Sequence, residues 1–241
     1  MNITLTGFMG AGKTAVGKRL AKRLGWTFVD LDERIAARTG KPIAQIFSEH
    51  SEAVFRRLER REVKRVIRGD QHVIATGGGA FLDPENRRLL KAIGPVVCLT
   101  AHPKTILERV KPTLATRPLL AAEPSLARIQ QLMEQRAPAY AKADLTIDTT
   151  GLAVDEIVER VWEAIGPWIC KSWQYLLKHS SQLSQRYGGK YVVVYNDHII
   201  ATGDTQLKAY QGIRRTISPD HELGIYYVPL PEEAPLALYV P

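Results

Sequence analysis

The chain has 241 residues and a mass of 26.9 kDa, which allows one large domain or a medium domain with a small companion. With 45% hydrophobic and 24% charged residues its composition is that of a globular protein, and no apolar stretch approaches the ~18 residues of a membrane span. The net charge of +8 indicates anionic partners, and residues 1–168 carry most of it, with 26 Lys+Arg against 19 Asp+Glu.

The first 168 residues alternate short apolar runs with longer amphipathic ones. Apolar runs without strict alternation are typical of buried parallel strands, which helices cover on both faces. We expect strands over Asn2–Thr6, Thr27–Asp30, Val73–Ala75, Pro95–Thr100 and Asp144–Asp148. We expect helices over Lys13–Leu24, after an Asp83 N-cap with Pro84 in the first turn, over Pro103–Val110, and over Ala153–Ile165. The pattern predicts an α/β domain with three layers, a parallel sheet flanked by helices.

One proline-rich segment, Lys111–Pro124, interrupts this alternation. It is either a surface loop or a mobile lid of the kind that excludes water during phosphoryl transfer. The segment by itself favours neither interpretation.

The pattern changes after Trp168, and residues 169–241 predict a second, small α+β domain. About seventy residues are close to the lower limit for independent folding. We expect a helix, a β-hairpin, a helix and a last strand, over Lys171–Arg186, Tyr191–Tyr195 with His198–Ala201, Asp204–Ile217 and Gly224–Val228.

Residues Gly7–Thr14 match the phosphate-loop pattern G-x-x-x-x-G-K-[ST] between a strand and a helix. Its backbone N–H groups point at phosphates, Lys13 bridges the β- and γ-phosphates, and the Thr14 hydroxyl coordinates Mg²⁺. The predicted nucleotide-binding residues of this loop are Gly10, Ala11, Gly12, Lys13, Thr14 and Ala15.

Two carboxylates, Asp30 and Asp32, lie two residues apart at the end of the second strand. They can divide labour, one near the Mg²⁺ shell and one accepting a hydrogen bond from a substrate hydroxyl. In isolation, the preferred interpretation is a helix N-cap with an acidic first turn, which is a common arrangement.

Two further features lie downstream. Arg56 and Glu59 are three residues apart, so they share a helix face on which the carboxylate can hold the guanidinium for an anionic substrate. The alternative is a solvated ion pair. Gly77-Gly78-Gly79 follows the third strand, where glycines permit a ligand to approach the backbone, or simply form a flexible loop.

Taken in order, these motifs resemble the shikimate kinase family. The phosphate loop, Asp30-x-Asp32, Arg56-x-x-Glu59, the triple glycine, an Arg-Pro-Leu-Leu segment at 117–120 and Arg136 before Tyr140 all match that family over roughly residues 1–167. The resemblance implies magnesium-dependent transfer of the ATP γ-phosphate to the 3-hydroxyl of shikimate.

The resemblance also implies roles for single residues. Asp32 would contact the accepting hydroxyl, and Asp30 would act near Mg²⁺ together with Thr14. The shikimate carboxylate would meet Arg56, oriented by Glu59, and Arg136, while the backbone of Gly78 would touch the substrate. Arg117 would fold over the ATP phosphates and Arg109 would lie against the adenine. Lys13, Asp32 and Arg117 are the residues implied in catalysis.

Other functions compete with this interpretation. Gluconate kinases and nucleoside monophosphate kinases also carry phosphate loops. The net charge is also compatible with a nucleotide-sensing or nucleic-acid-binding module. We expect shikimate and ATP as partners, no nucleic acid, no membrane, and a monomer. With two cysteines, Cys98 and Cys170, a disulfide framework is excluded and a cytoplasmic location expected. Residues 169–241 faintly resemble a small domain family of unknown function.

Overall fold

The computed structural model describes residues 1–116, 120, 125–169, 175–176, 178–195, 198–213 and 224–232. The chain divides into two compact units, Met1–Ala164 and Ile165–Pro241. In the part of the chain that the structure describes, no helix is both long and apolar enough to cross a membrane.

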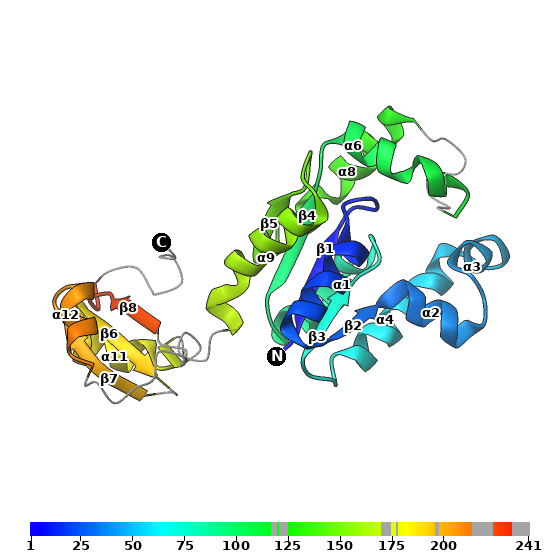
Figure 1. The fold of residues 1–241 in the computed structure, drawn as a ribbon. Helices are drawn as coiled ribbons and strands as arrows, with labels where there is room; N and C mark the ends of the chain where they lie inside the picture. Colours follow the sequence, from blue (N-terminus) through cyan, green and yellow to red (C-terminus); the bar gives the residue numbers. More distant parts are fainter. Residues whose placement is uncertain are drawn as a thin grey trace. The chain divides into compact units, whose positions relative to one another are not determined.

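A parallel sheet of five strands forms the centre of the first unit, in the order β2-β3-β1-β4-β5 (Figure 1). All five residues of β1 are buried, as expected of a central parallel strand with both faces covered. The strands are β1 (Ile3–Gly7), β2 (Thr27–Asp30), β3 (His72–Ala75), β4 (Val96–Thr100) and β5 (Leu145–Asp148). The predicted strands are confirmed, each within one residue at either end.

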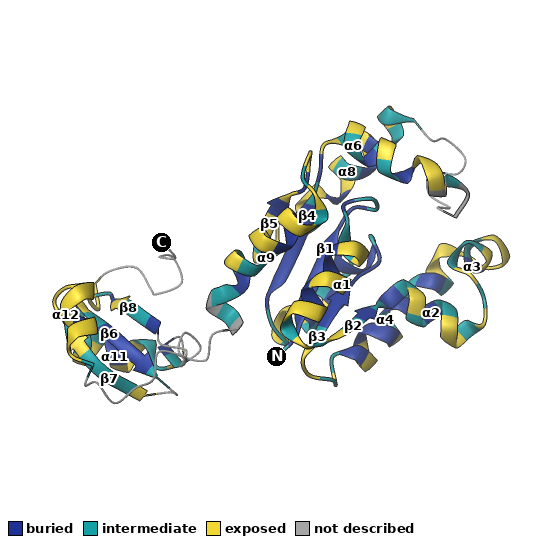
Figure 2. Ribbon diagram, viewed as in Figure 1, coloured by how far each residue is buried: buried dark blue, intermediate teal, exposed yellow. Residues whose placement is uncertain are grey.

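Helices flank this sheet and turn their polar sides to solvent, while the buried residues concentrate along the strands (Figure 2). The three-layer α/β fold is therefore confirmed. The helices are α1 (Lys13–Leu24), α2 (Leu31–Thr39), α3 (Ile43–Glu49), α4 (Glu52–Val66), α5 (Pro84–Ala92), α6 (Pro103–Val110), α8 (Leu126–Tyr140) and α9 (Val154–Ile169), with 3₁₀ turns η1 (Ala80–Leu82) and η2 (Lys111–Thr116).

Local sequence signals set several helix ends. Asp83 caps α5 by accepting from the N–H groups of Glu85 and Asn86, with Pro84 in the first turn as predicted. The predicted end of α9 at Ile165 is wrong: the helix runs on to Ile169, past Gly166 and Pro167. A proline removes one backbone hydrogen bond, and here that loss falls in the last turn, where it does not end the helix.

The second unit contains an antiparallel sheet in the order β7-β6-β8. Its elements are α11 (Ser180–Tyr187), β6 (Lys190–Tyr195), β7 (His198–Gly203), α12 (Gln206–Gln211) and β8 (Gly224–Val228). The predicted hairpin and last strand are confirmed. Of the helix predicted over Asp204–Ile217, residues 214–217 lie outside the described part of the chain; within that part the helix is shorter, because Thr205 caps α12 and Gly212 ends it. Parts of the helix predicted over Lys171–Arg186 lie outside the described residues.

Candidate active site

The predicted site residues gather at the carboxyl end of the parallel sheet. The phosphate loop begins at the last residue of β1, Asp30 ends β2 with Asp32 just beyond it, and the triple glycine follows β3. Because β1 lies between β3 and β4, the loop is central, at the point where the strand order changes direction. Ligands of open α/β sheets bind in this position.

The phosphate loop is a tight backbone turn that requires glycine. Gly7 has φ 127°, and a methyl group added there would lie 2.0 Å from the Leu99 carbonyl oxygen. Gly12 has φ 101° and forms the N-cap of α1, so that helix begins with its N–H groups at the loop. Lys13 Nζ donates to the carbonyl oxygens of Gly7 and Phe8, both at 2.9 Å, which holds the ammonium across the loop.

Asp30 connects the phosphate loop to α2. Its Oδ2 accepts from the Thr14 hydroxyl at 2.8 Å, and its Oδ1 caps α2 by accepting from the Asp32 N–H at 3.0 Å. The N-cap interpretation of Asp30 is therefore confirmed, and its other oxygen lies against the Thr14 hydroxyl of the phosphate loop, while its place near Mg²⁺ stays a prediction. A hydroxyl and a carboxylate side by side fit Mg²⁺, which takes few protein ligands and completes its shell with waters and phosphate oxygens.

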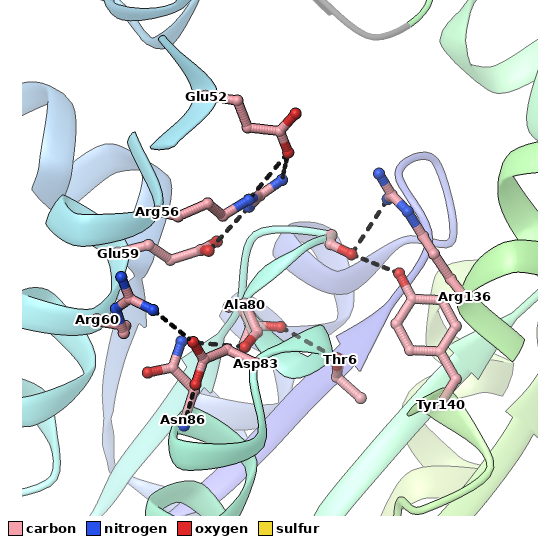
Figure 3. A network of polar contacts seen from close by, with 12 residues as sticks. Thr6, Glu52, Arg56, Glu59, Arg60, Ala80, Asp83, Asn86, Arg136 and Tyr140 are labelled. Carbon is pink, nitrogen blue, oxygen red and sulfur yellow. Dashed lines mark hydrogen bonds and ion pairs between the residues drawn. The ribbon is translucent and has the colours of Figure 1, made fainter. Parts of the chain in front are cut away.

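Arg56 lies between two carboxylates of its own helix. Its Nη1 donates to Glu59 Oε2 at 2.8 Å and its Nη2 to Glu52 Oε1 at 2.8 Å, as Figure 3 shows. The Glu59 side chain is 1% exposed, whereas Glu52 is 55% exposed. A guanidinium held from both sides has one rotamer, and so little ordering entropy is lost when an anion binds it.

Glu59 is the buried partner of this pair. Burial raises its pKa to about 7, against the opposing effect of Arg56, and the nearby Asp32 raises it further. Among the described residues, Glu59 Oε1 has no hydrogen-bond partner. A buried carboxylate whose pKa is this high, beside a second carboxylate, is typical of functional sites.

The triple glycine makes room for side chains of the site itself. A methyl group added at Gly77 would lie 2.6 Å from Asp32 Oδ1 and 2.9 Å from Glu59 Oε1; one at Gly79 would lie 2.2 Å from Arg56 Nη1. At Gly78 the nearest atom would be Arg136 Nη1, at 3.1 Å. Four predicted site residues thus converge on this one turn.

Arg136 reaches the turn from α8. Its Nη1 donates to the Gly78 carbonyl oxygen at 3.2 Å, and the Tyr140 hydroxyl donates to the same oxygen at 2.6 Å (Figure 3). The guanidinium also lies 5.2 Å from the centre of the Phe8 ring, and the residue is 5% exposed. Arg136 is therefore held against both the triple glycine and the phosphate loop.

Arg109 lies on α6 beside the phosphate loop. It donates to the Gly10 carbonyl oxygen at 3.4 Å, and to the side chain and backbone of Thr149 at 2.9 and 2.8 Å. The Thr149 hydroxyl lies 3.3 Å from the Ala11 carbonyl oxygen. These contacts tie the loop to the end of β5. The adenine contact implied for Arg109 stays a prediction, and Arg117 lies outside the described residues.

Sequence reasoning missed three residues of the site. Glu52 precedes Arg56 by four positions, a spacing that signals a helical ion pair. The Tyr140 hydroxyl and Thr149 carry no such signal, because their partners, the Gly78 carbonyl and Arg109, lie 62 and 40 residues away in the chain.

In the second unit and elsewhere in the described residues, no group of three or more His, Cys, Asp or Glu side chains could hold a metal ion. Residues 182–241 match a family of unknown function, DUF5678. The match attaches no activity to this unit.

The first unit is similar to named proteins. Residues 9–166 match the shikimate kinase family model. Shikimate kinase from Thermus thermophilus is 46% identical over 163 residues, which cover 68% of this chain and 89% of the relative; that from Thermodesulfovibrio yellowstonii is 48% identical over 160 residues, covering 66% and 92%.

Solved structures agree with these sequences. Shikimate kinase from Acinetobacter baumannii, in complex with shikimate, superposes with a TM-score of 0.66 at 37% identity, covering 68% of this chain and 92% of that one. The enzyme from Aquifex aeolicus gives 0.60 at 32% identity, covering 69% and 96%. Fold, site geometry and relatives agree: the chain belongs to the shikimate kinase family.

Proposed function

We propose that the chain transfers the γ-phosphate of ATP to the 3-hydroxyl of shikimate, giving shikimate 3-phosphate and ADP. The observation that carries this proposal is the convergence of Asp32, Glu59, Arg56 and Arg136 on the triple glycine, beside the phosphate loop. Two guanidinium groups suit a carboxylate, and an adjoining carboxylate suits a hydroxyl.

In this proposal, Arg56 and Arg136 bind the shikimate carboxylate from α4 and α8. Glu52 and Glu59 hold Arg56 in place, and the Gly78 carbonyl does the same for Arg136. Such prior ordering lets a rigid substrate bind with its hydroxyl fixed, which lowers the entropy cost of the reaction.

Asp32 then accepts the proton of the 3-hydroxyl. At the same time the hydroxyl oxygen bonds to the γ-phosphorus, and the bond from this phosphorus to the β–γ bridging oxygen breaks, which releases ADP. The loop N–H groups and Lys13 bind the phosphates, where charge builds up. Thr14 and Asp30 would hold Mg²⁺, which neutralises phosphate charge when bound. Arg109 against the adenine, Arg117 over the phosphates, a monomeric state and a cytoplasmic location belong to the same proposal.

The test is turnover of the full chain with ATP and Mg²⁺ against a panel of shikimate, gluconate and nucleoside monophosphates. We expect ADP release only with shikimate. Arg136→Ala should raise KM for shikimate far more than KM for ATP, since its guanidinium is assigned to the substrate carboxylate. Equal effects on both substrates would contradict that assignment, and ATP binding without turnover would favour a nucleotide-sensing module.

A further inference from the structure

Glu62 is a buried carboxylate on α4 for which the proposed reaction has no use. Its side chain is 2% exposed, and both of its oxygens are engaged by guanidinium groups. Oε1 accepts from Arg34 Nε at 2.6 Å, and Oε2 pairs with Arg38 Nε at 2.9 Å and Arg65 Nη1 at 3.2 Å. Burying an ionised carboxylate is costly unless its charge is paired, and the three guanidinium groups pair the charge of Glu62.

The three arginines come from two helices. Arg65 lies on α4 itself, one turn beyond Glu62, whereas Arg34 and Arg38 lie on α2. The contact of Arg65 with Glu62 therefore stays within α4. The contacts of Arg34 and Arg38 with the same carboxylate join α2 to α4.

These same two helices carry opposite ends of the proposed substrate site. Asp32, assigned to the hydroxyl, lies in the first turn of α2, two residues before Arg34. Glu59, which holds the carboxylate-binding Arg56, lies one turn before Glu62 on α4. The Glu62 contacts are therefore about one helical turn away from the site.

Like charges act between the helices at the site itself. Asp32 Oδ1 and Glu59 Oε1 both approach the position that a Gly77 side chain would take, and Asp32 is one cause of the raised pKa of Glu59. Two carboxylates this close repel each other when ionised. An attractive contact between α2 and α4 has to balance that repulsion if their spacing is to be fixed.

We propose that Glu62 is a positioning residue, which fixes α2 against α4 through Arg34 and Arg38 and so sets the spacing between Asp32 and Arg56. The inference rests on the proposed function, because this spacing matters only when one rigid substrate reaches both residues. Glu62 touches neither substrate and acts through the two helices.

The test compares the loss of the Glu62 contacts that join α2 to α4 with the loss of its contact to Arg65 inside α4. The Arg34→Ala/Arg38→Ala double variant removes the link from α2, whereas Arg65→Ala removes a guanidinium from the same carboxylate and leaves the link in place. We expect the double variant to raise KM for shikimate roughly tenfold or more, since misplacement by about 1 Å can cost a factor of a hundred. KM for ATP should stay within about twofold in both variants, and Arg65→Ala should bind shikimate like the wild type.

Circular dichroism at the assay temperature shows whether each variant is folded. Should the double variant fail to fold, the single variants Arg34→Lys and Arg38→Lys keep the charge but lose the Nε donor, and each should still raise KM for shikimate alone. An equal rise in both KM values, or the same rise in Arg65→Ala, would mean a purely structural role and overturn the proposal. An unchanged KM for shikimate would overturn it too. Absence of shikimate-dependent ADP release in the wild type would instead contradict the proposed function.

Discussion

Gly79→Ala tests the carboxylate-binding geometry with a single methyl group. Gly79 has φ −108° and ψ −16°, a conformation open to alanine, so the substitution acts through contact alone. The methyl carbon would lie 2.2 Å from Arg56 Nη1, and ordinary contact begins at 3.4 Å, so the guanidinium must retreat by roughly 1 Å. Loss of one charge-assisted contact to the substrate is worth about 1.5–3 kcal/mol, which corresponds to a rise in KM of about 10- to 150-fold.

Steady-state kinetics with shikimate varied at saturating ATP measure this change. Gly166→Ala is the matched control, because it makes the same substitution where the structure shows nothing within 4 Å of the added carbon. KM for ATP should not change in either variant. A Gly79→Ala enzyme with the wild-type KM for shikimate would refute the position assigned to Arg56.

Two further predictions follow from burial and from the division of the chain. Because burial raises the pKa of Glu59 to about 7 from its ordinary 4.5, the protonated carboxyl stabilises the fold fully below pH 4.5, and this contribution is lost as the pH rises through 7. Urea denaturation measures the free energy of unfolding, and between pH 4.5 and 8 that of the wild type should fall by roughly 3 kcal/mol relative to that of Glu59→Gln. The same dependence on pH in both proteins would contradict the burial argument. Removing residues 169–241 should leave kcat and both KM values within about twofold, since the site described above lies within Met1–Ala164; a larger change would give the second unit a part in catalysis.

The parallel sheet was predictable because short, mostly apolar runs recur between the helical patterns, and β3 and β4 are the clearest of them. A strand buried on both faces reads as a continuous apolar run, and Gly25 and Asp83 mark helix ends through conformation and capping. The ends of α2, α3 and α4 were not predicted. Charged residues dominate that region, and the ion pairs that organise it, such as Glu62 with Arg34, join positions 28 residues apart.

The site could be predicted as residue types but not as contacts. For Asp30, capping and a place near the Mg²⁺ shell stood as alternatives, yet a carboxylate has two oxygens: in the structure one caps α2 and the other accepts from the Thr14 hydroxyl of the phosphate loop. On α4, spacing paired Arg56 with Glu59 correctly, but it did not distinguish Arg56, with its buried partner, from the exposed arginines of the same helix.

The triple glycine shows why contacts decide the meaning of a motif. Three small residues after a strand indicate that something approaches the backbone, and a ligand is the obvious candidate. In the structure the approaching groups are carboxylates from α2 and α4 and guanidinium groups from α4 and α8. Because these helices lie far apart in sequence, only the fold brings their side chains to one turn. The glycines therefore let the protein's own charged groups converge, and each alanine substitution should disturb the group that its methyl meets.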